Sequence, residues 1–160
     1  MSKPDKTCLL VVDDEPEVCD SVYHLLHSNY RVLRAHGAAE AVELLSQYAV
    51  EIIMTDQRMP DVTGVEMLQK IKSQYPEAIR ILFTGYADIK SVVAAINQGH
   101  VFRYLSKPWQ PEELEAVIAD AAAEYRRMVQ QAQKLAKCQE RVAQLERENQ
   151  LLRELSKDKG

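Results

Sequence analysis

Acidic, hydroxyl and amine side chains stand at or just after the ends of short apolar runs in this sequence. They are Asp13, Asp14, Asp56, Thr84 and Lys107. If the fold brings the three carboxylates together, they repel one another unless a proton or a cation relieves the repulsion. Carboxylate oxygens suit a hard divalent cation such as Mg²⁺ or Mn²⁺, and the pattern includes no His or Cys that would favour zinc.

Such a group of side chains could place a phosphoryl group on a carboxylate. Beside a bound cation, Asp56 could attack a phosphoryl donor in line and form an aspartyl phosphate. Lys107 would neutralise the charge that develops on the phosphoryl oxygens, and the hydroxyl of Thr84 would donate to them. Simpler interpretations stay open: Asp56 caps the next helix, Lys107 only pairs with the acids, and Thr84 is a turn residue before Gly85.

The elements that carry these residues alternate between strands and helices along the chain. Short apolar runs without strict alternation are typical of strands buried on both faces of a parallel sheet. The predicted strands cover residues 8–12, 30–34, 52–56, 79–83 and 101–105, and helices begin at Pro16, Ala38, Gly64, Ile89 and Pro111. Right-handed crossovers make the strands parallel, so their carboxyl ends, and the candidate site residues, meet at one edge of the sheet. In the second helix we expect Ala41, Val42, Leu44 and Leu45 to face the core.

The composition limits the cellular compartment in which the chain can act and the partners that it can bind. The formal net charge of −4 argues against unspecific nucleic-acid binding, which needs a basic surface. No apolar run approaches the ~20 residues of a membrane span, and the N-terminus lacks the apolar core of a signal peptide. Cys8, Cys19 and Cys138 are scattered and fit a reducing compartment. We therefore expect a cytoplasmic chain that contacts neither nucleic acid nor membrane directly.

Four short motifs around the candidate residues resemble the receiver domain of two-component response regulators. They are Val-Val-Asp-Asp at 11–14, Asp-x-x-Met-Pro at 56–60, Thr84, and Tyr-x-x-Lys-Pro at 104–108. Each motif alone is weak evidence for this family, but all four motifs in this order and at this spacing are highly specific for it. The resemblance covers about residues 7–123 and implies an α/β, flavodoxin-like fold with a five-stranded parallel sheet of order 2-1-3-4-5.

The resemblance also implies roles for particular residues. Asp56 would accept a phosphoryl group from a sensor histidine kinase. The metal ligands would be Asp14, Asp13 (directly or through water), Asp56 and the backbone carbonyl of Arg58. Thr84 and Tyr104 would form a switch pair, in which phosphorylation draws the hydroxyl in and the ring turns inward behind it. By analogy, the Lys107–Pro108 peptide bond would be cis.

Three further residues lie near the expected site and bear on its properties. Arg58 and Tyr86 flank it, and we hypothesise that they screen the acyl phosphate from water and so set its lifetime. Gly85 stands where the family often has alanine, a departure that could loosen the loop. The stretches Asp-Gln-Arg-Met-Pro, Thr-Gly-Tyr-Ala-Asp and Lys-Pro-Trp resemble receivers of HD-GYP-type cyclic-di-GMP phosphohydrolases and of hydrogenase-type transcription regulators.

The last third of the chain predicts a long helix. No Gly or Pro occurs between Pro111 and Gly160, so one helix could run from Glu112 to about Leu155. Residues 124–156 would form a coiled coil, with residues 1–6 flexible and 157–160 disordered. Its core positions are Val142, Leu145, Asn149 and Leu152. A β-branched residue at a, Leu at d and a single Asn at a favour a parallel dimer in fixed register.

Charge pairs and an alternative complete the interpretation of the tail. In a parallel dimer, Arg141 would face Glu146 and Glu148 would face Arg153, and both pairs are attractive. The alternative is a solvated helix that frays in a monomer. Cys138 would face its counterpart in the partner helix as core filling and not as a disulfide.

Three functions remain to be separated. The first is a phosphorylation-controlled dimeric switch that is no enzyme beyond its own phosphorylation and dephosphorylation. Its output domain, a cyclic-di-GMP phosphohydrolase or a DNA-binding regulator, would lie beyond this chain. The second is a phosphohydrolase with an aspartate nucleophile, although such enzymes usually carry an acid where Arg58 stands. The third is a scaffold in which only the coiled coil matters.

Overall fold

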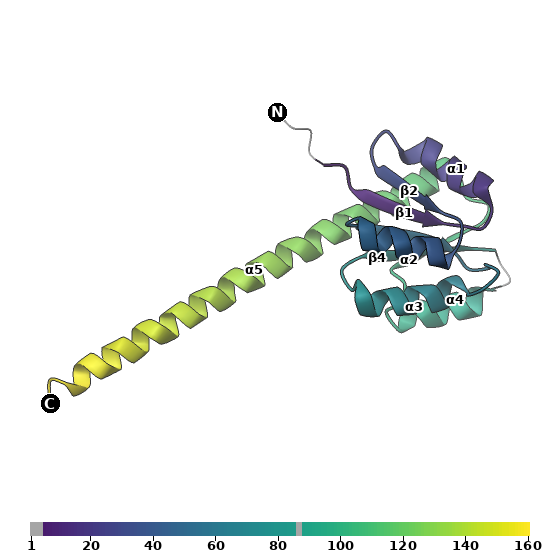
Figure 1. The fold of residues 1–160 in the computed structure, drawn as a ribbon. Coiled ribbons are helices and arrows are strands. Elements are labelled where there is room, and N and C mark those ends of the chain that lie inside the picture. Colours follow the sequence, from purple (N-terminus) through teal and green to yellow (C-terminus); the bar gives the residue numbers. More distant parts are fainter. Residues whose placement is uncertain (1–4, 86–87) are drawn as a thin grey trace. The chain divides into compact units, whose positions relative to one another are not determined.

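The computed structural model describes residues 5–85 and 88–160 of the chain (Figure 1). Its strands are β1 (Cys8–Val12), β2 (Arg31–Ala35), β3 (Ile52–Asp56), β4 (Ile79–Thr84) and β5 (Arg103–Ser106). Its helices are α1 (Pro16–Leu26), α2 (Ala38–Gln47), α3 (Gly64–Gln74), α4 (Ile89–Asn97) and α5 (Pro111–Lys157). The chain divides into two compact units, residues 1–125 and residues 126–160.

The five strands form one parallel sheet in the order β2-β1-β3-β4-β5. This topology confirms the flavodoxin-like fold that the resemblance to receiver domains implied. Asp56 pairs with Phe83 and Thr84 pairs with Ser106, so the carboxyl ends of β3, β4 and β5 lie in step. Polar residues that end these strands therefore share one edge of the sheet.

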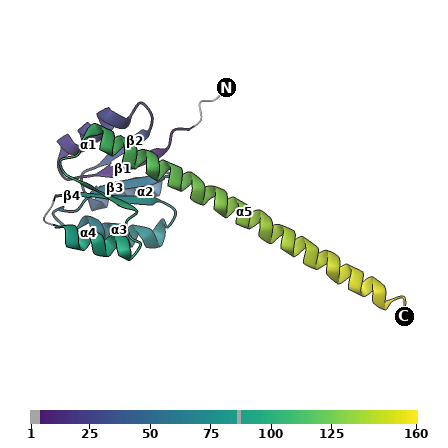
Figure 2. The same ribbon diagram turned by 180° about the vertical axis from the view of Figure 1, so that it is seen from behind.

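Helices cover both faces of the sheet. In Figure 1, α2 lies in front of the strands and α3 and α4 lie below them, and Figure 2 shows the first part of α5 in front from the opposite side. β1 and β3 are buried along their whole length, as expected of central strands packed on both faces. The first unit thus buries apolar side chains on both faces of the sheet.

The start of α3 is held close to Asp56 by a helix cap and a glycine. Thr63 caps the helix: its hydroxyl accepts from the Glu66 amide, and the Glu66 side chain accepts from the Thr63 amide. At the next position, a Cβ on Gly64 would overlap the backbone carbonyl oxygen of Asp56 and lie 2.8 Å from Leu82 Cδ1. Because Gly64 has no side chain, α3 can approach β3 this closely.

Two details differ from the sequence predictions. Val42 was expected to face the core but is 48% exposed, because Ala41 and Leu45 face the sheet and Val42 lies ~100° further round the helix. The last strand begins at Arg103, two residues after the predicted start at Val101. The carbonyl of His100 accepts from Arg80 Nε at 2.9 Å, and the regular pairing with β4 starts only at Arg103, opposite Ile81.

The second unit consists of the continuation of α5, which ends at Lys157, slightly beyond the predicted end. Its predicted core positions are solvent-exposed in the single chain: Val142, Leu145 and Leu152 are between 41% and 63% exposed. Within the described residues, no helix combines the length and the apolar character that crossing a bilayer requires.

Candidate functional site

Three carboxylates gather at the carboxyl edge of the sheet. Asp13 and Asp14 follow β1, and Asp56 is the last residue of β3. One carboxylate oxygen from each of the three residues lies within 4.8 Å of the others. Asp13 and Asp56 are buried, whereas Asp14 is exposed. The site is therefore a pair of buried acids with a third at the entrance.

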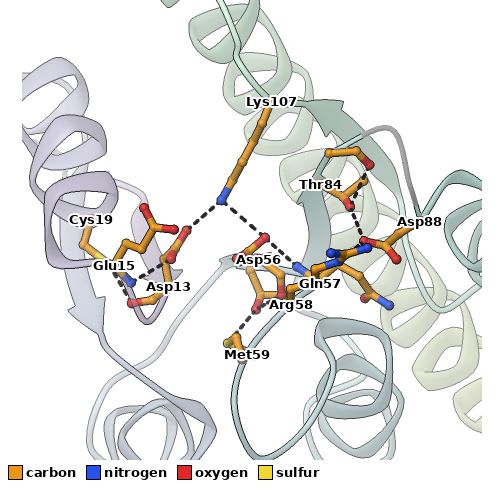
Figure 3. A network of polar contacts seen from close by, with 12 residues as sticks. Asp13, Glu15, Cys19, Asp56, Gln57, Arg58, Met59, Thr84, Asp88 and Lys107 are labelled. Atoms are coloured by element: carbon orange, nitrogen blue, oxygen red, sulfur yellow. Dashed lines mark hydrogen bonds and ion pairs between the residues drawn. The ribbon is translucent and has the colours of Figure 1, made fainter.

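Lys107 connects the two buried acids. Its Nζ lies 3.1 Å from Asp13 Oδ2 and 3.3 Å from Asp56 Oδ1 (Figure 3). The Lys107 amide donates to the carbonyl of Thr84 at 2.8 Å, which fastens the loop after β5 to the end of β4. The Lys107–Pro108 peptide bond is cis, as expected from the resemblance.

Backbone amides orient the carboxylates. The Gln57 amide donates to Asp56 Oδ1 at 2.8 Å, and the Glu15 amide donates to Asp13 Oδ1 at 2.9 Å. Among the described residues, no protein donor contacts the other oxygen of Asp56. The carboxylate is thus held through Oδ1, and Oδ2 remains available to a ligand.

The electrostatics of the site leave surplus negative charge. Burial raises the pKa of Asp56 and the neighbouring Asp13 raises it further, while Lys107 and the Gln57 amide oppose this. Burial works to lower the pKa of Lys107, but Asp13 and Asp56 more than offset it, so the net pKa is raised. Lys107 therefore stays protonated, and a single ammonium faces three acids.

This donor set fits a hard divalent cation. The three side chains offer only oxygen, and no described His or Cys belongs to the group. A divalent charge would relieve the repulsion that burial and Asp13 impose on Asp56. Asp13, Asp14 and Asp56 are thus the side chains that could hold Mg²⁺ or Mn²⁺. Arg58, whose carbonyl was the fourth expected ligand, follows Asp56 by two residues.

The expected switch residues lie at neighbouring strands. Thr84 is buried at the end of β4, and its Oγ1 lies 3.2 Å from the carbonyl of Gly85 and 3.5 Å from Asp88 Oδ2. Tyr104, on β5, is 43% exposed. In this arrangement the hydroxyl donates within its own loop, and the aromatic ring faces solvent. Tyr86 lies outside the described residues.

Sequence reasoning missed two residues that shape the site. Gln57 is buried, and its side-chain carbonyl accepts from the Val65 amide at 3.0 Å, which ties α3 to the end of β3. Asp88 accepts a 2.9 Å bond from Arg58 Nε (Figure 3). Neither has a local signal, because their partners lie eight and thirty residues away along the chain.

Known proteins match this chain over its first unit. A family model described as "Response regulator receiver domain" matches residues 9–119. The hydrogenase transcriptional regulatory protein HoxA of Cupriavidus necator is 39% identical over 113 residues, which cover 71% of this chain and 23% of HoxA. The chain spans about a quarter of the length of the curated relatives it matches.

Solved structures agree with the family match. The signal receiver domain of an HD domain-containing protein from Pseudomonas fluorescens Pf-5 has a TM-score of 0.75 at 30% identity, covering 81% of this chain and 96% of that one. A structure described as adenylate cyclase from Rhodopirellula baltica has a TM-score of 0.80 at 28% identity, covering 82% and 98%. Since the family model matches well over half of the sequence, the chain belongs to the receiver domains of two-component response regulators.

Proposed function

We propose that this chain is a phosphoacceptor receiver in which Asp56 takes a phosphoryl group from a sensor histidine kinase in the cytoplasm. The observation that carries the proposal is the contact of Lys107 Nζ with both Asp13 and Asp56 at 3.1 Å and 3.3 Å. A protonated amine beside a buried, amide-anchored carboxylate is the arrangement that phosphoryl transfer to aspartate requires.

The protein side chains would divide the work as follows. The Asp56 oxygen that carries no protein bond attacks phosphorus as the bond to the kinase imidazole breaks, and the leaving nitrogen keeps the electron pair. Lys107 neutralises charge on the phosphoryl oxygens. Asp13, Asp14, Asp56 and the Arg58 carbonyl would hold Mg²⁺ or Mn²⁺, which supplies charge neutralisation for the phosphoryl oxygens when bound.

The response would involve the last two strands of the first unit. Thr84 Oγ1, which donates within its loop in the unmodified chain, would turn to the phosphoryl oxygens, and Tyr104 would turn inward behind it. Thr84 pairs with Ser106 across β4 and β5, so a shift at residue 84 is transmitted to β5 and then to the start of α5. Such a switch requires two arrangements of similar free energy.

The test is covalent modification of the full chain by acetyl phosphate with Mg²⁺. A switch gains one phosphoryl group that borohydride reduces at Asp56, and Asp56→Asn gains none. A phosphohydrolase would instead release phosphate over many turnovers, and a scaffold would remain unmodified. Stable modification at any residue other than Asp56, or none, would refute the proposal.

We further propose that residues 124–156 form a parallel dimeric coiled coil. The support is the exposed apolar seam of Val142, Leu145 and Leu152, with Asn149 at the one polar position. A seam of this kind on a helix otherwise rich in charge is stabilised by pairing with a second copy. The signal from Asp56 would then reach an output domain through the paired helices.

Cys138 offers a built-in test of the dimer and of its direction. It is exposed in the single chain and lies in the same heptad register as Val142 and Leu145. In a parallel, in-register dimer the two thiols face each other, so mild oxidation with diamide joins two chains. Leu145→Asp should abolish both the dimer in sedimentation and this cross-link, and Gln144→Asp, outside the seam, is the matched control. A chain that sediments as a monomer would favour the solvated helix.

The output domain remains a choice between two classes. The likeness to a hydrogenase transcriptional regulatory protein favours a DNA-binding regulator, and the likeness to the receiver of an HD domain-containing protein favours a cyclic-di-GMP phosphohydrolase. The identity of 39% for the former against 30% for the latter favours the regulator. The complete reading frame tests this choice directly.

A further inference from the structure

Asp88 binds two groups that lie beside the phosphoacceptor. Arg58 Nε donates to Asp88 Oδ2 at 2.9 Å, and Thr84 Oγ1 lies 3.5 Å from the same oxygen. Figure 3 shows the Arg58 side chain turned toward Asp88, on the opposite side of Asp56 from Asp13. One carboxylate thus joins the loop after β3 to the loop after β4.

The usual structural role of an aspartate at this position does not account for Asp88. It stands at the N-cap of α4, but its side chain makes no capping hydrogen bond to that helix. Its oxygen is bonded instead to Arg58, whose side chain is 72% exposed against 22% for Asp88. The ion pair therefore bridges the two loops, and the Asp88 side chain does not cap the helix.

Arg58 and Thr84 would have a second use once Asp56 carries a phosphoryl group. The pKa of Arg58 is raised first by Asp88 and to a smaller extent by the charge of Asp56, so the guanidinium lies in the field of the phosphoacceptor. Thr84 has one hydroxyl proton, which it can donate to Gly85, to Asp88 or to a phosphoryl oxygen, but to one at a time. An anion on Asp56 must therefore compete with Asp88 for Arg58, and with Asp88 and the Gly85 carbonyl for the Thr84 hydroxyl.

We infer that Asp88 is a positioning residue for the phosphotransfer reaction: it holds Arg58 and the Thr84 hydroxyl away from Asp56 until a phosphoryl group displaces it. Asp88 acts through these two side chains and does not itself touch the phosphoryl group. The inference rests on the proposed function, because it requires that Asp56 is the phosphoacceptor. Asp88 thereby sets how strongly the unmodified chain resists the change to the phosphorylated arrangement.

The test is the affinity of the full chain for beryllofluoride, a phosphoryl mimic, in the presence of Mg²⁺. Trp109 is the sole tryptophan and packs edge-on against Phe83 with 5.3 Å between ring centroids, so its fluorescence reports on the site. Asp88→Ala should bind about two- to fivefold more tightly, the range expected when an exposed ion pair is removed. Asp88→Glu should restore the wild-type affinity by keeping the carboxylate. Unchanged affinity in Asp88→Ala overturns the inference.

A matched control separates the effect of the clasp, by which we mean the contacts of Asp88 with Arg58 and Thr84, from the effect of a general change in charge. Asp20→Ala also removes an acid that pairs with an exposed arginine. Asp20 lies on α1, and its Oδ1 is 2.7 Å from Nη1 of Arg34 on β2. This variant should leave the beryllofluoride affinity unchanged. In an Arg58→Ala background, most of the gain from Asp88→Ala should disappear, because the partner that Asp88 restrains is already absent. A gain of full size in that background means that Asp88 acts only by its charge and overturns the inference.

A measurement without metal completes the test. In the presence of a chelator, thermal unfolding of the two single variants and the double variant should show that Arg58 and Asp88 are energetically coupled. Additive effects overturn the clasp. If the wild-type chain binds beryllofluoride and accepts a phosphoryl group but Asp88→Ala behaves like it, only the positioning role fails. If the wild-type chain does neither, the proposed function fails as well.

Discussion

The ammonium of Lys107 lies 3.1 Å from the carboxylate of Asp13, although ninety-four residues separate them in the sequence. The contact spans the sheet edge from the loop after β1 to the loop after β5 and passes over the end of β3. It brings the loops after β1 and β5 together beside Asp56, and it makes Lys107 the cation on which the proposed phosphoryl transfer would depend.

Replacing Lys107 with alanine should lower the rate of phosphorylation by acetyl phosphate about a hundredfold, the effect of removing one charged donor from a phosphoryl site. Without the ammonium, nothing in the described protein offsets the raised pKa of Asp56 except the Gln57 amide. The rate is measured by intact mass over time. Lys134→Ala, in the exposed tail, is the control and should react at the wild-type rate. Equal rates for the two variants would contradict the role given to Lys107.

Asp56→Asn should make the metal-free chain more stable at neutral pH. Burial raises the pKa of Asp56 above its ordinary 3.8 in the folded chain, so the folded state binds more protons than the unfolded state between these values. Stability is therefore lost as pH rises through the raised pKa, and the ionised carboxylate destabilises the fold above it. Thermal unfolding with a chelator should show a gain from the substitution that is largest at neutral pH and vanishes below 3.8. A gain independent of pH would contradict this account, and Mg²⁺ should narrow the gap.

Gly64→Ala should destabilise the first unit by about 1–3 kcal/mol, because the new Cβ meets backbone that cannot move away cheaply. That backbone is the carbonyl of Asp56, so the proposed phosphoacceptor should shift and the phosphorylation rate should fall with the stability. Gly37→Ala is the matched control at the start of α2, where nothing lies within 4 Å of the added Cβ. Chemical denaturation and acetyl phosphate kinetics measure both effects. Equal behaviour of the two variants would show that the close approach is unimportant.

Arg80→Met should lower the free energy of unfolding by about 1–3 kcal/mol, the cost of leaving partly buried carbonyl acceptors without a donor. The guanidinium donates to the carbonyls of His100 and Ala78, each at 2.9 Å, and burial lowers its pKa. Since these bonds lie far along β4 from Thr84, phosphorylation of the folded protein should not change. Arg34→Met, which removes an exposed pair, should cost less than about 1 kcal/mol. Similar losses for both variants would contradict the prediction.

Gly85→Ala should be tolerated and should stabilise the chain by about 0.4–1 kcal/mol through reduced freedom of the unfolded state. The added Cβ meets nothing within 4 Å, and the described glycine with a positive φ is Gly99. The alanine common in the family therefore fits here. Denaturant unfolding measures the change, and a loss of stability would indicate that the loop needs glycine.

Local patterns in the sequence predicted the parallel sheet and the edge where the polar residues gather, and the resemblance to receiver domains implied the strand order. The sheet and its edge follow from the buried runs at β1 and β3 and the helix starts at Pro16 and Gly64, whereas the resemblance rests on motifs at fixed spacing. Each such pattern lies within a short stretch of sequence, so it can be recognised without knowing how the chain folds. The long helix after Pro111 was predictable for the same reason, since no residue in it breaks a helix.

Only the tertiary structure decided which side chains touch. The clasp of Arg58 by Asp88, the close approach of Gly64 to Asp56 and the capture of the His100 carbonyl by Arg80 each join segments that are distant or differently oriented. The exposure of Val42 was decided by the rotation of α2 against the sheet. These contacts depend on packing angles and loop paths that many sequences could satisfy, so no local pattern in this chain encodes them.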